Sequence, residues 1–151
     1  MIGDGAAIVH GAARMTYDVN VVYARNAENL ARIVAALKPY KPYLRGVPPG
    51  LPFIWDERTL QGGLNFTLTT TIGDVDLLAD VPGGGLYEQI VPFTVELEAF
   101  GVRCLVVTLD MLIQLKRAAG RPKDLEIIAE LQNILENRFV KQPNLLDSQE
   151  A

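Results

Sequence analysis

The sequence predicts one α+β (α/β-like) domain in which helices flank a mixed β-sheet. Three observations predict it. The 151 residues are 49% hydrophobic and carry a formal charge of only -4, which is typical of a chain that folds around a core. Short β-branched and aromatic runs alternate with helical segments over the first two thirds, and helical periodicity fills the last third. A chain of this length is expected to form a single domain.

The first third is expected to hold a short helix, a strand and a longer helix. Residues 5–11 predict a helix closed by a glycine, and residues 17–23 predict a strand rich in β-branched and aromatic side chains. Asn26 is a suitable N-cap for a helix that runs to Leu37. The five prolines within 39–52 then predict an irregular loop, and its length suggests a function.

The middle third is expected to consist mainly of strands, at residues 64–70, 74–79, 93–98 and 102–107. The first two of these strands predict a hairpin, because a turn signal separates them. A glycine-rich loop at 83–85 and a short helix near 86–90 lie between the two strand pairs.

Two helices are expected at the end of the chain. Thr108 is a suitable N-cap for a helix that ends at Gly120, and Pro122 suits the first turn of the next helix. The predicted boundaries are 1–140 for the domain, 1–107 for its sheet-bearing part, 108–140 for the helical pair, and 141–151 for a flexible tail.

The composition excludes several classes of protein. The single cysteine, Cys104, excludes a disulfide framework and a cysteine zinc site, and we expect it in the core. No apolar run reaches the length of a membrane span and no signal peptide is visible, so we expect a cytoplasmic protein without a membrane partner. The mild acidity argues against a broad nucleic-acid surface, and no sequence-specific DNA binding is evident.

Polar side chains interrupt two of the predicted strands. Period-2 alternation places Asp18 and Asn20 on one face of the first strand, and Asp74 and Asp76 on one face of another. If the two strands are neighbours, these side chains converge and offer the oxygen ligands that Mg²⁺ prefers. The alternative is that they are the exposed polar residues of a half-solvated sheet.

A compact basic segment lies in the predicted helical pair. Four of the 14 basic residues fall within eight positions, namely Lys116, Arg117, Arg121 and Lys123. Lys116 continues the apolar stripe of its helix, so we expect its side chain to pass the edge of the core or to point into a cleft. The alternative is the ordinary preference of cations for a helix C-terminus.

Four segments occur in one order along the chain. They are Gly3-Asp4-Gly5 with a small-residue helix that ends at His10-Gly11; Arg14-x-Thr16-x-Asp18-x-Asn20; Thr70-x-x-Gly73-x-x-Asp76-Leu77-Leu78; and Leu112-x-x-Leu115-Lys116-Arg117 through Arg121-Pro122-Lys123-Asp124-Leu125. Over about residues 3–135 the chain thereby resembles the minimal nucleotidyltransferases of the DNA polymerase beta superfamily. Within this superfamily, the chain is most similar to the proteins that resemble the AbiEii-type toxin components of type IV toxin–antitoxin systems.

The resemblance implies a nucleotidyltransferase fold and a reaction. The family transfers a nucleoside monophosphate from an NTP to an acceptor, here an RNA or a protein, with two Mg²⁺ or Mn²⁺ ions. By position, the implied catalytic metal ligands are Asp18, Asp76 and, more weakly, Asn20. The implied phosphate-binding residues are Gly3, Gly5, Arg14, Lys116 and Lys123. A cognate antitoxin is an implied partner.

The chain departs from the family pattern at three places. Asn20 replaces the second carboxylate of the metal-binding pair, which would weaken catalysis. Asp4 stands where a second glycine is expected, and its charge would repel a triphosphate unless the side chain faces away or itself recruits a metal ion. Only Met1 and Ile2 stand where the family has a first strand.

These departures keep two other hypotheses open beside an active enzyme. In the first, a catalytically degenerate nucleotidyltransferase fold acts as a nucleotide- or partner-binding module. In the second, the spacing is fortuitous and the domain is structural.

Overall fold

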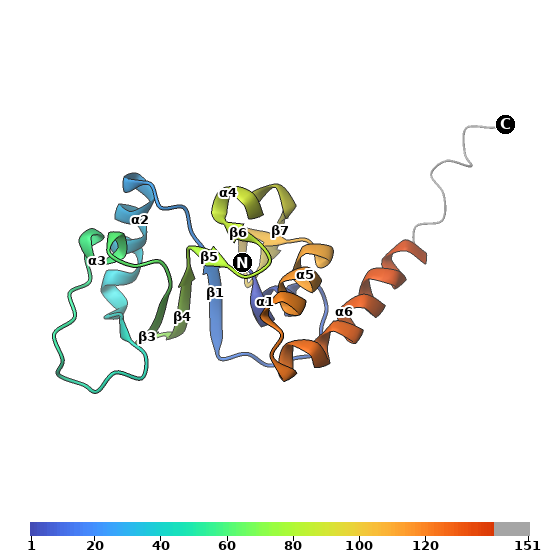
Figure 1. Ribbon diagram of the computed structural model, residues 1–151, viewed down its shortest axis with the longest axis horizontal. Coiled ribbons are helices and arrows are strands. Elements are labelled where there is room, and N and C mark those ends of the chain that lie inside the picture. Colours follow the sequence, from blue (N-terminus) through green and yellow to red (C-terminus); the bar gives the residue numbers. More distant parts are fainter. Residues whose placement is uncertain (141–151) are drawn as a thin grey trace.

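A mixed four-stranded sheet occupies one end of the computed structural model, which describes residues 1–140 (Figure 1). Its strands lie in the order β1 (Asp18–Val22), β4 (Gly73–Leu78), β3 (Phe66–Thr70) and β2 (Tyr43–Leu44). β1 runs parallel to β4, whereas the β4–β3 and β3–β2 pairs are antiparallel. The predicted α+β class and the mixed sheet are thus confirmed.

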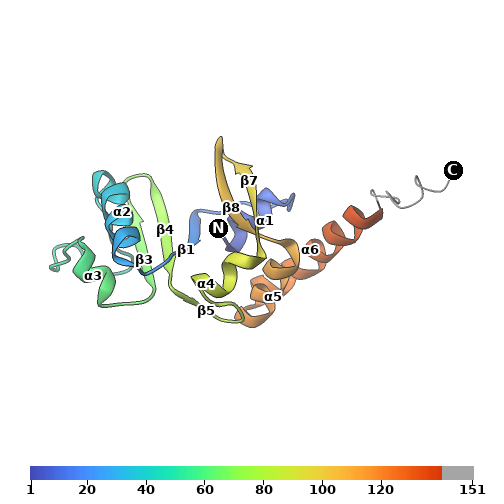
Figure 2. The same ribbon diagram turned by 90° about the horizontal axis from the view of Figure 1, so that it is seen from above.

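Two helices cover one face of this sheet. Figure 2 shows α2 (Ala27–Leu37) and α3 (Glu57–Gln61) on the same side of the strands. The Asn26 side chain accepts a hydrogen bond of 2.9 Å from the Asn29 amide, so the predicted N-cap starts α2. Leu30 of α2 packs in one hydrophobic cluster with Leu68 and Leu77 of the sheet. The apolar face of the sheet is therefore buried, and its other face is left for polar side chains.

A second hydrophobic cluster forms around the other end of the molecule. Its elements are α1 (Gly3–Val9), β7 (Thr94–Ala99), β8 (Val102–Val107), α5 (Leu109–Ala119) and α6 (Pro122–Val140). Leu112, Ile127 and Leu131 are its fully buried large side chains. The β7–β8 hairpin thus packs with the C-terminal helices.

Five short elements lie between the longer ones and were not all predicted. They are η1 (Lys38–Tyr40), β5 (Asp80–Val81), β6 (Gly85–Leu86), α4 (Tyr87–Ile90) and η2 (Val91–Phe93). The two-residue strands β2, β5 and β6 carry no periodic signal in the sequence, because so short a strand is defined only by its pairing partner. Among residues 1–140, no helix has both the length and the apolar character that a membrane span requires.

Helix boundaries agree with the sequence where a side chain caps the helix. Thr108 accepts a hydrogen bond of 3.3 Å from the Met111 amide at the start of α5, and Gly120 ends the helix in the left-handed conformation. The predicted helix 5–11 was wrong at both ends, because α1 starts and stops two residues earlier. The predicted tail, 141–151, lies outside the described residues.

Met1 and Ile2 join the two clusters. The Ile2 amide donates to the Asn20 carbonyl at 3.1 Å, whereas the Met1 ammonium donates to the Leu105 carbonyl at 2.7 Å. The Val107 amide donates in turn to the Met1 carbonyl at 3.2 Å. These two residues thus lie between β1 and β8, at the place where the family resemblance implied a longer strand.

Candidate functional site

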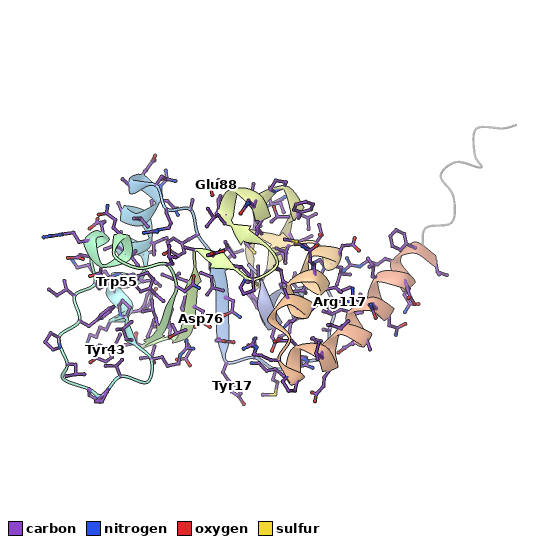
Figure 3. The ribbon with its side chains drawn as sticks, in the orientation of Figure 1. Tyr17, Tyr43, Trp55, Asp76, Glu88 and Arg117 are labelled. Atoms are coloured by element: carbon purple, nitrogen blue, oxygen red, sulfur yellow. The ribbon has the colours of Figure 1, made fainter. Side chains whose placement is uncertain are left out.

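The register of β1 on β4 brings the predicted carboxylates together. Asp18 lies opposite Asp74, and Asn20 lies opposite Asp76. Because side chains alternate along a strand, all four occupy the sheet face that α2 does not cover. We call these four residues the acid face. Figure 3 shows Asp76 on β4 in the middle of the molecule.

A single arginine pairs with two carboxylates of the acid face. Arg45 follows β2, and its side chain reaches across β3 to β4. The Arg45 Nη2 lies 2.8 Å from Asp76 Oδ1, and the Nε lies 3.2 Å from Asp74 Oδ2. The same Nη2 donates to the Leu68 carbonyl at 2.7 Å. The acid face is therefore paired with a cation of the protein itself.

The surroundings of Asp76 act on its pKa in opposite directions. Burial raises the pKa of the Asp76 carboxyl, the Arg45 guanidinium opposes this effect, and the charges of Asp18 and Asp74 add to the rise. Asp18 has a different partner, because its carboxylate accepts a hydrogen bond of 2.8 Å from the Thr16 hydroxyl. The charges of Asp18 and Asp74 thus act on the pKa of Asp76, although Arg45 pairs with Asp74 and Asp76 and Thr16 with Asp18.

The glycine turn lies directly against the acid face. Gly3 has a φ of +71°, which only glycine adopts at low cost, and a side chain there would collide with the Asn20 amide group. Gly5 is buried in α1, next to the Met1 sulfur. The family resemblance implied that both glycines and Asn20 belong to one site; the structure places Gly3 against Asn20, whereas Gly5 lies against Met1.

A second charged group lies where α1, α5 and α6 meet. It consists of Asp4, Lys116, Arg121 and Asp124, and we call it the ion cluster. The Lys116 Nζ lies 2.6 Å from Asp4 Oδ1 and 3.3 Å from Asp124 Oδ1. The Arg121 Nε donates to Asp124 Oδ2 at 2.6 Å. Lys116 is 6% exposed and Asp124 is completely buried, so the cluster ties the three helices together.

The ion cluster explains two expectations from the sequence. The apolar phase of α5 predicted that Lys116 passes the edge of the core or points into a cleft, and its side chain is buried. Asp4, which would repel a triphosphate, instead pairs with Lys116. The implied phosphate-binding role of Lys116 therefore requires an anion to compete with two carboxylates of the protein.

Pairing in the ion cluster shifts two pKa values. Burial acts to raise the pKa of Asp124, but hydrogen bonds from Arg121 and Lys116 outweigh it and the pKa is lowered. The pKa of Arg121 is raised, first by its hydrogen bond to Asp124 and further by the charges of Asp4 and Asp18. Arg121 thus links the ion cluster electrostatically to the acid face.

The remaining predicted residues lie at the margin of these two groups. Arg14 is half-buried in the connection between α1 and β1, and Lys123 is exposed in the first turn of α6. Neither side chain forms an ion pair with a residue of the described part. The structure therefore brings Asp18, Asn20, Asp76 and Gly3 together. Arg14 and Lys123 take no part in the ion pairs of the acid face or the ion cluster.

A groove of about 310 Å³ opens at the start of β1 and β4, and its lining includes Val19 and Val75 of the sheet face opposite to the acid face. Asp18 and Asp74 line it together with Tyr17, Ile72 and Phe100, whose side chains are 83%, 66% and 72% exposed. Exposed aromatic rings next to carboxylates can receive a planar or apolar group of a ligand.

The donors of the acid face suit a divalent cation in their chemistry. Carboxylate and amide oxygens are the ligands that Mg²⁺ and Mn²⁺ prefer. Within residues 1–140, however, no three acidic, histidine or cysteine side chains form a metal-binding group. The contacts give the reason, because Asp74 and Asp76 turn to Arg45 while Asp18 turns to Thr16.

Arg45 is the residue of the site that the sequence did not predict. It lies in the segment expected to be a proline-rich loop, and it reaches β4 only because β2 pairs with β3 through two residues. The only signal available was the length of that loop, which suggested a function. A comparison with family models finds no match for this chain, and neither does a comparison with curated proteins.

Proposed function

We propose that this protein transfers a nucleoside monophosphate from an NTP to an RNA or protein acceptor. The observation that carries the proposal is the parallel register of β1 on β4, which aligns Asp18 with Asp74 and Asn20 with Asp76 beside the glycine turn of α1. Carboxylates on neighbouring strands next to a glycine turn are what phosphoryl chemistry with Mg²⁺ or Mn²⁺ requires.

Each group of the site has a role in this proposal. Asp18, Asp76 and, more weakly, Asn20 would hold the ions, which would supply charge neutralisation for the phosphates. The turn at Gly3 lets the backbone approach an anion closely. The groove beside Asp18 and Asp74 offers room for the acceptor. In the toxin–antitoxin setting that the resemblance implies, a cognate antitoxin would be a further partner of this cytoplasmic enzyme.

Label transfer tests the proposal. Purified protein is incubated with each α-labelled NTP, Mn²⁺ and total RNA, and the label on RNA and on protein is measured. We expect transfer that Asp76→Asn lowers by at least a factor of about 100, since a metal ligand is lost. Asp80→Asn is the matched control, because it makes the same chemical change at an exposed position. Absence of label on any RNA or protein, with every NTP, refutes the proposed activity.

A second function is favoured by a specific observation. Asn20 gives the site one carboxylate fewer, and Arg45 already pairs with Asp74 and Asp76. A fold with these features could bind a nucleotide or a partner without catalysis. Titration calorimetry separates the two functions, because NTP binding without label transfer supports the binding module. The substitution Asn20→Asp should raise Mn²⁺ affinity in either case, and an unchanged affinity argues against Asn20 as a ligand.

A further inference from the structure

Arg45 occupies a position that a cation of the site would need. Its guanidinium lies 2.8 Å from Asp76 and 3.2 Å from Asp74, so two of the three carboxylates of the acid face share one protein cation. An arginine side chain is not deprotonated in proteins. The positive charge can therefore leave these carboxylates only if the side chain moves.

The structure gives Arg45 freedom to move. It follows an edge strand of two residues, and only its amide, which donates to the Thr67 carbonyl at 2.9 Å, continues the sheet. Its side chain is 31% exposed. To turn from the acid face to a ligand on the solvent side, the guanidinium must give up its two ion pairs and the hydrogen bond to the Leu68 carbonyl, but it breaks no long strand pairing.

A phosphate is the ligand that would attract it. The planar fork of an arginine matches phosphate oxygens in two parallel hydrogen bonds, as it matches a carboxylate. We propose that Arg45 is a positioning residue that locks the acid face against divalent cations until the phosphates of a nucleotide draw its guanidinium away. This inference rests on the proposed function, because it concerns the same carboxylates and the same class of ligand.

Two consequences of opposite sign follow. Without Arg45, the carboxylates of Asp74 and Asp76 lose their competitor, so a divalent cation binds more tightly in the absence of nucleotide. A polyphosphate in the absence of metal loses its arginine contact and binds less tightly. A residue that only supports the fold would weaken both kinds of binding.

The experiment measures both affinities in Arg45→Gln. Mn²⁺ binding without nucleotide is followed by electron paramagnetic resonance, and inorganic tripolyphosphate binding in EDTA is followed by calorimetry. We expect Arg45→Gln to bind Mn²⁺ at least tenfold more tightly and tripolyphosphate at least fivefold more weakly than the wild type. Arg103→Gln is the matched control, since Arg103 pairs with Glu96 on the exposed surface of the hairpin. Its affinities should stay unchanged.

Thermal melting shows whether Arg45→Gln is folded, and if it is not, a second variant takes its place. Arg45→Lys keeps the charge without the fork and should change both affinities in the same directions by smaller factors. Unchanged or weaker Mn²⁺ binding in the Arg45 variants, unchanged tripolyphosphate binding, or no binding of Mn²⁺ to any of these proteins overturns the inference. If both affinities change as expected but no label is transferred, the inference stands and the proposed enzyme activity falls.

Discussion

Lys116 and Asp4 form an ion pair of 2.6 Å although 112 positions separate them in the chain. The pair links the last turns of α5 to the first turn of α1, next to the glycine turn. Asp124 adds a second carboxylate to the same ammonium at 3.3 Å. The residue that the sequence assigned to phosphate binding is therefore first a structural element, and its removal should be visible in stability without any ligand.

Lys116→Met should lower the free energy of unfolding by about 1.5–3 kcal/mol at pH 7, because it removes the ammonium that pairs with Asp4 and Asp124, while Arg121 still compensates the buried carboxylate of Asp124. Urea unfolding measures the change. Lys123→Met is the control, since Lys123 is exposed and its loss should cost less than about 0.5 kcal/mol. A loss below about 1 kcal/mol for Lys116→Met would show that the pairs contribute little and that the lysine is available to an anion.

Stability should depend on pH through His10, the single histidine of the chain. The His10 Nε2 donates to the Val107 carbonyl at 2.7 Å, so the ring in the neutral form accepts from Arg138 Nη2 at Nδ1, at 3.1 Å. Burial lowers the pKa of His10 below its usual 6.5, the Val107 hydrogen bond opposes this, and the Arg138 charge lowers it further. Protonation would thus place two cations in contact.

The sign of the effect follows from linkage. Because the folded-state pKa of His10 lies below the unfolded value, the folded form binds fewer protons, and stability is complete above pH 6.5 and falls as the pH drops through that value. The slope reaches at most about 1.4 kcal/mol per pH unit. Urea midpoints between pH 5 and 8 measure it, and His10→Gln should remove this part of the slope. The Met1 ammonium, whose pKa burial also lowers, is present in both proteins and cancels in the comparison. Equal slopes for the two proteins would contradict the prediction.

The sequence predicted those parts of the site that depend on local pattern. Strand alternation predicted that Asp18 and Asn20 share a face, and helix phase predicted that Lys116 lies against the core. Neither pattern contains information on distant partners, so Asp4 was expected beside a triphosphate and not beside Lys116. Arg45 escaped prediction for the same reason. Its role depends on a two-residue strand, and only tertiary pairing with β3 defines that strand.

Gly3→Ala should destabilise the fold through two separate effects. A left-handed residue other than glycine costs about 1–2 kcal/mol, and the new methyl group would also collide with the Asn20 amide. Gly101→Ala isolates the first effect, because Gly101 has a φ of +79° and open space around it. We expect Gly3→Ala to cost at least about 1 kcal/mol more than Gly101→Ala, as overpacking does. A double-mutant cycle with Asn20→Ala should recover that excess, and additive costs would contradict contact between the two residues.

The loop after Arg45 should open more easily when Tyr43 loses its hydroxyl. That hydroxyl lies 2.9 Å from the Pro48 carbonyl and 3.1 Å from the Leu51 carbonyl, so its single proton can be donated to either and ties the second half of the proline-rich loop to β2. Loss of the hydroxyl should lower the free energy of opening the loop by about 0.5–1 kcal/mol, which corresponds to an open population about two- to fivefold larger.

Trypsin cleavage after Arg45 measures this opening, because proteolysis follows the open population when the loop opens and closes quickly. Tyr43→Phe should be cleaved there about two- to fivefold faster than the wild type. Tyr40→Phe is the control, since no hydrogen bond of the Tyr40 hydroxyl occurs among the described residues. Equal cleavage rates for Tyr43→Phe and the wild type would mean that the ion pairs of Arg45, and not the tyrosine, close this loop.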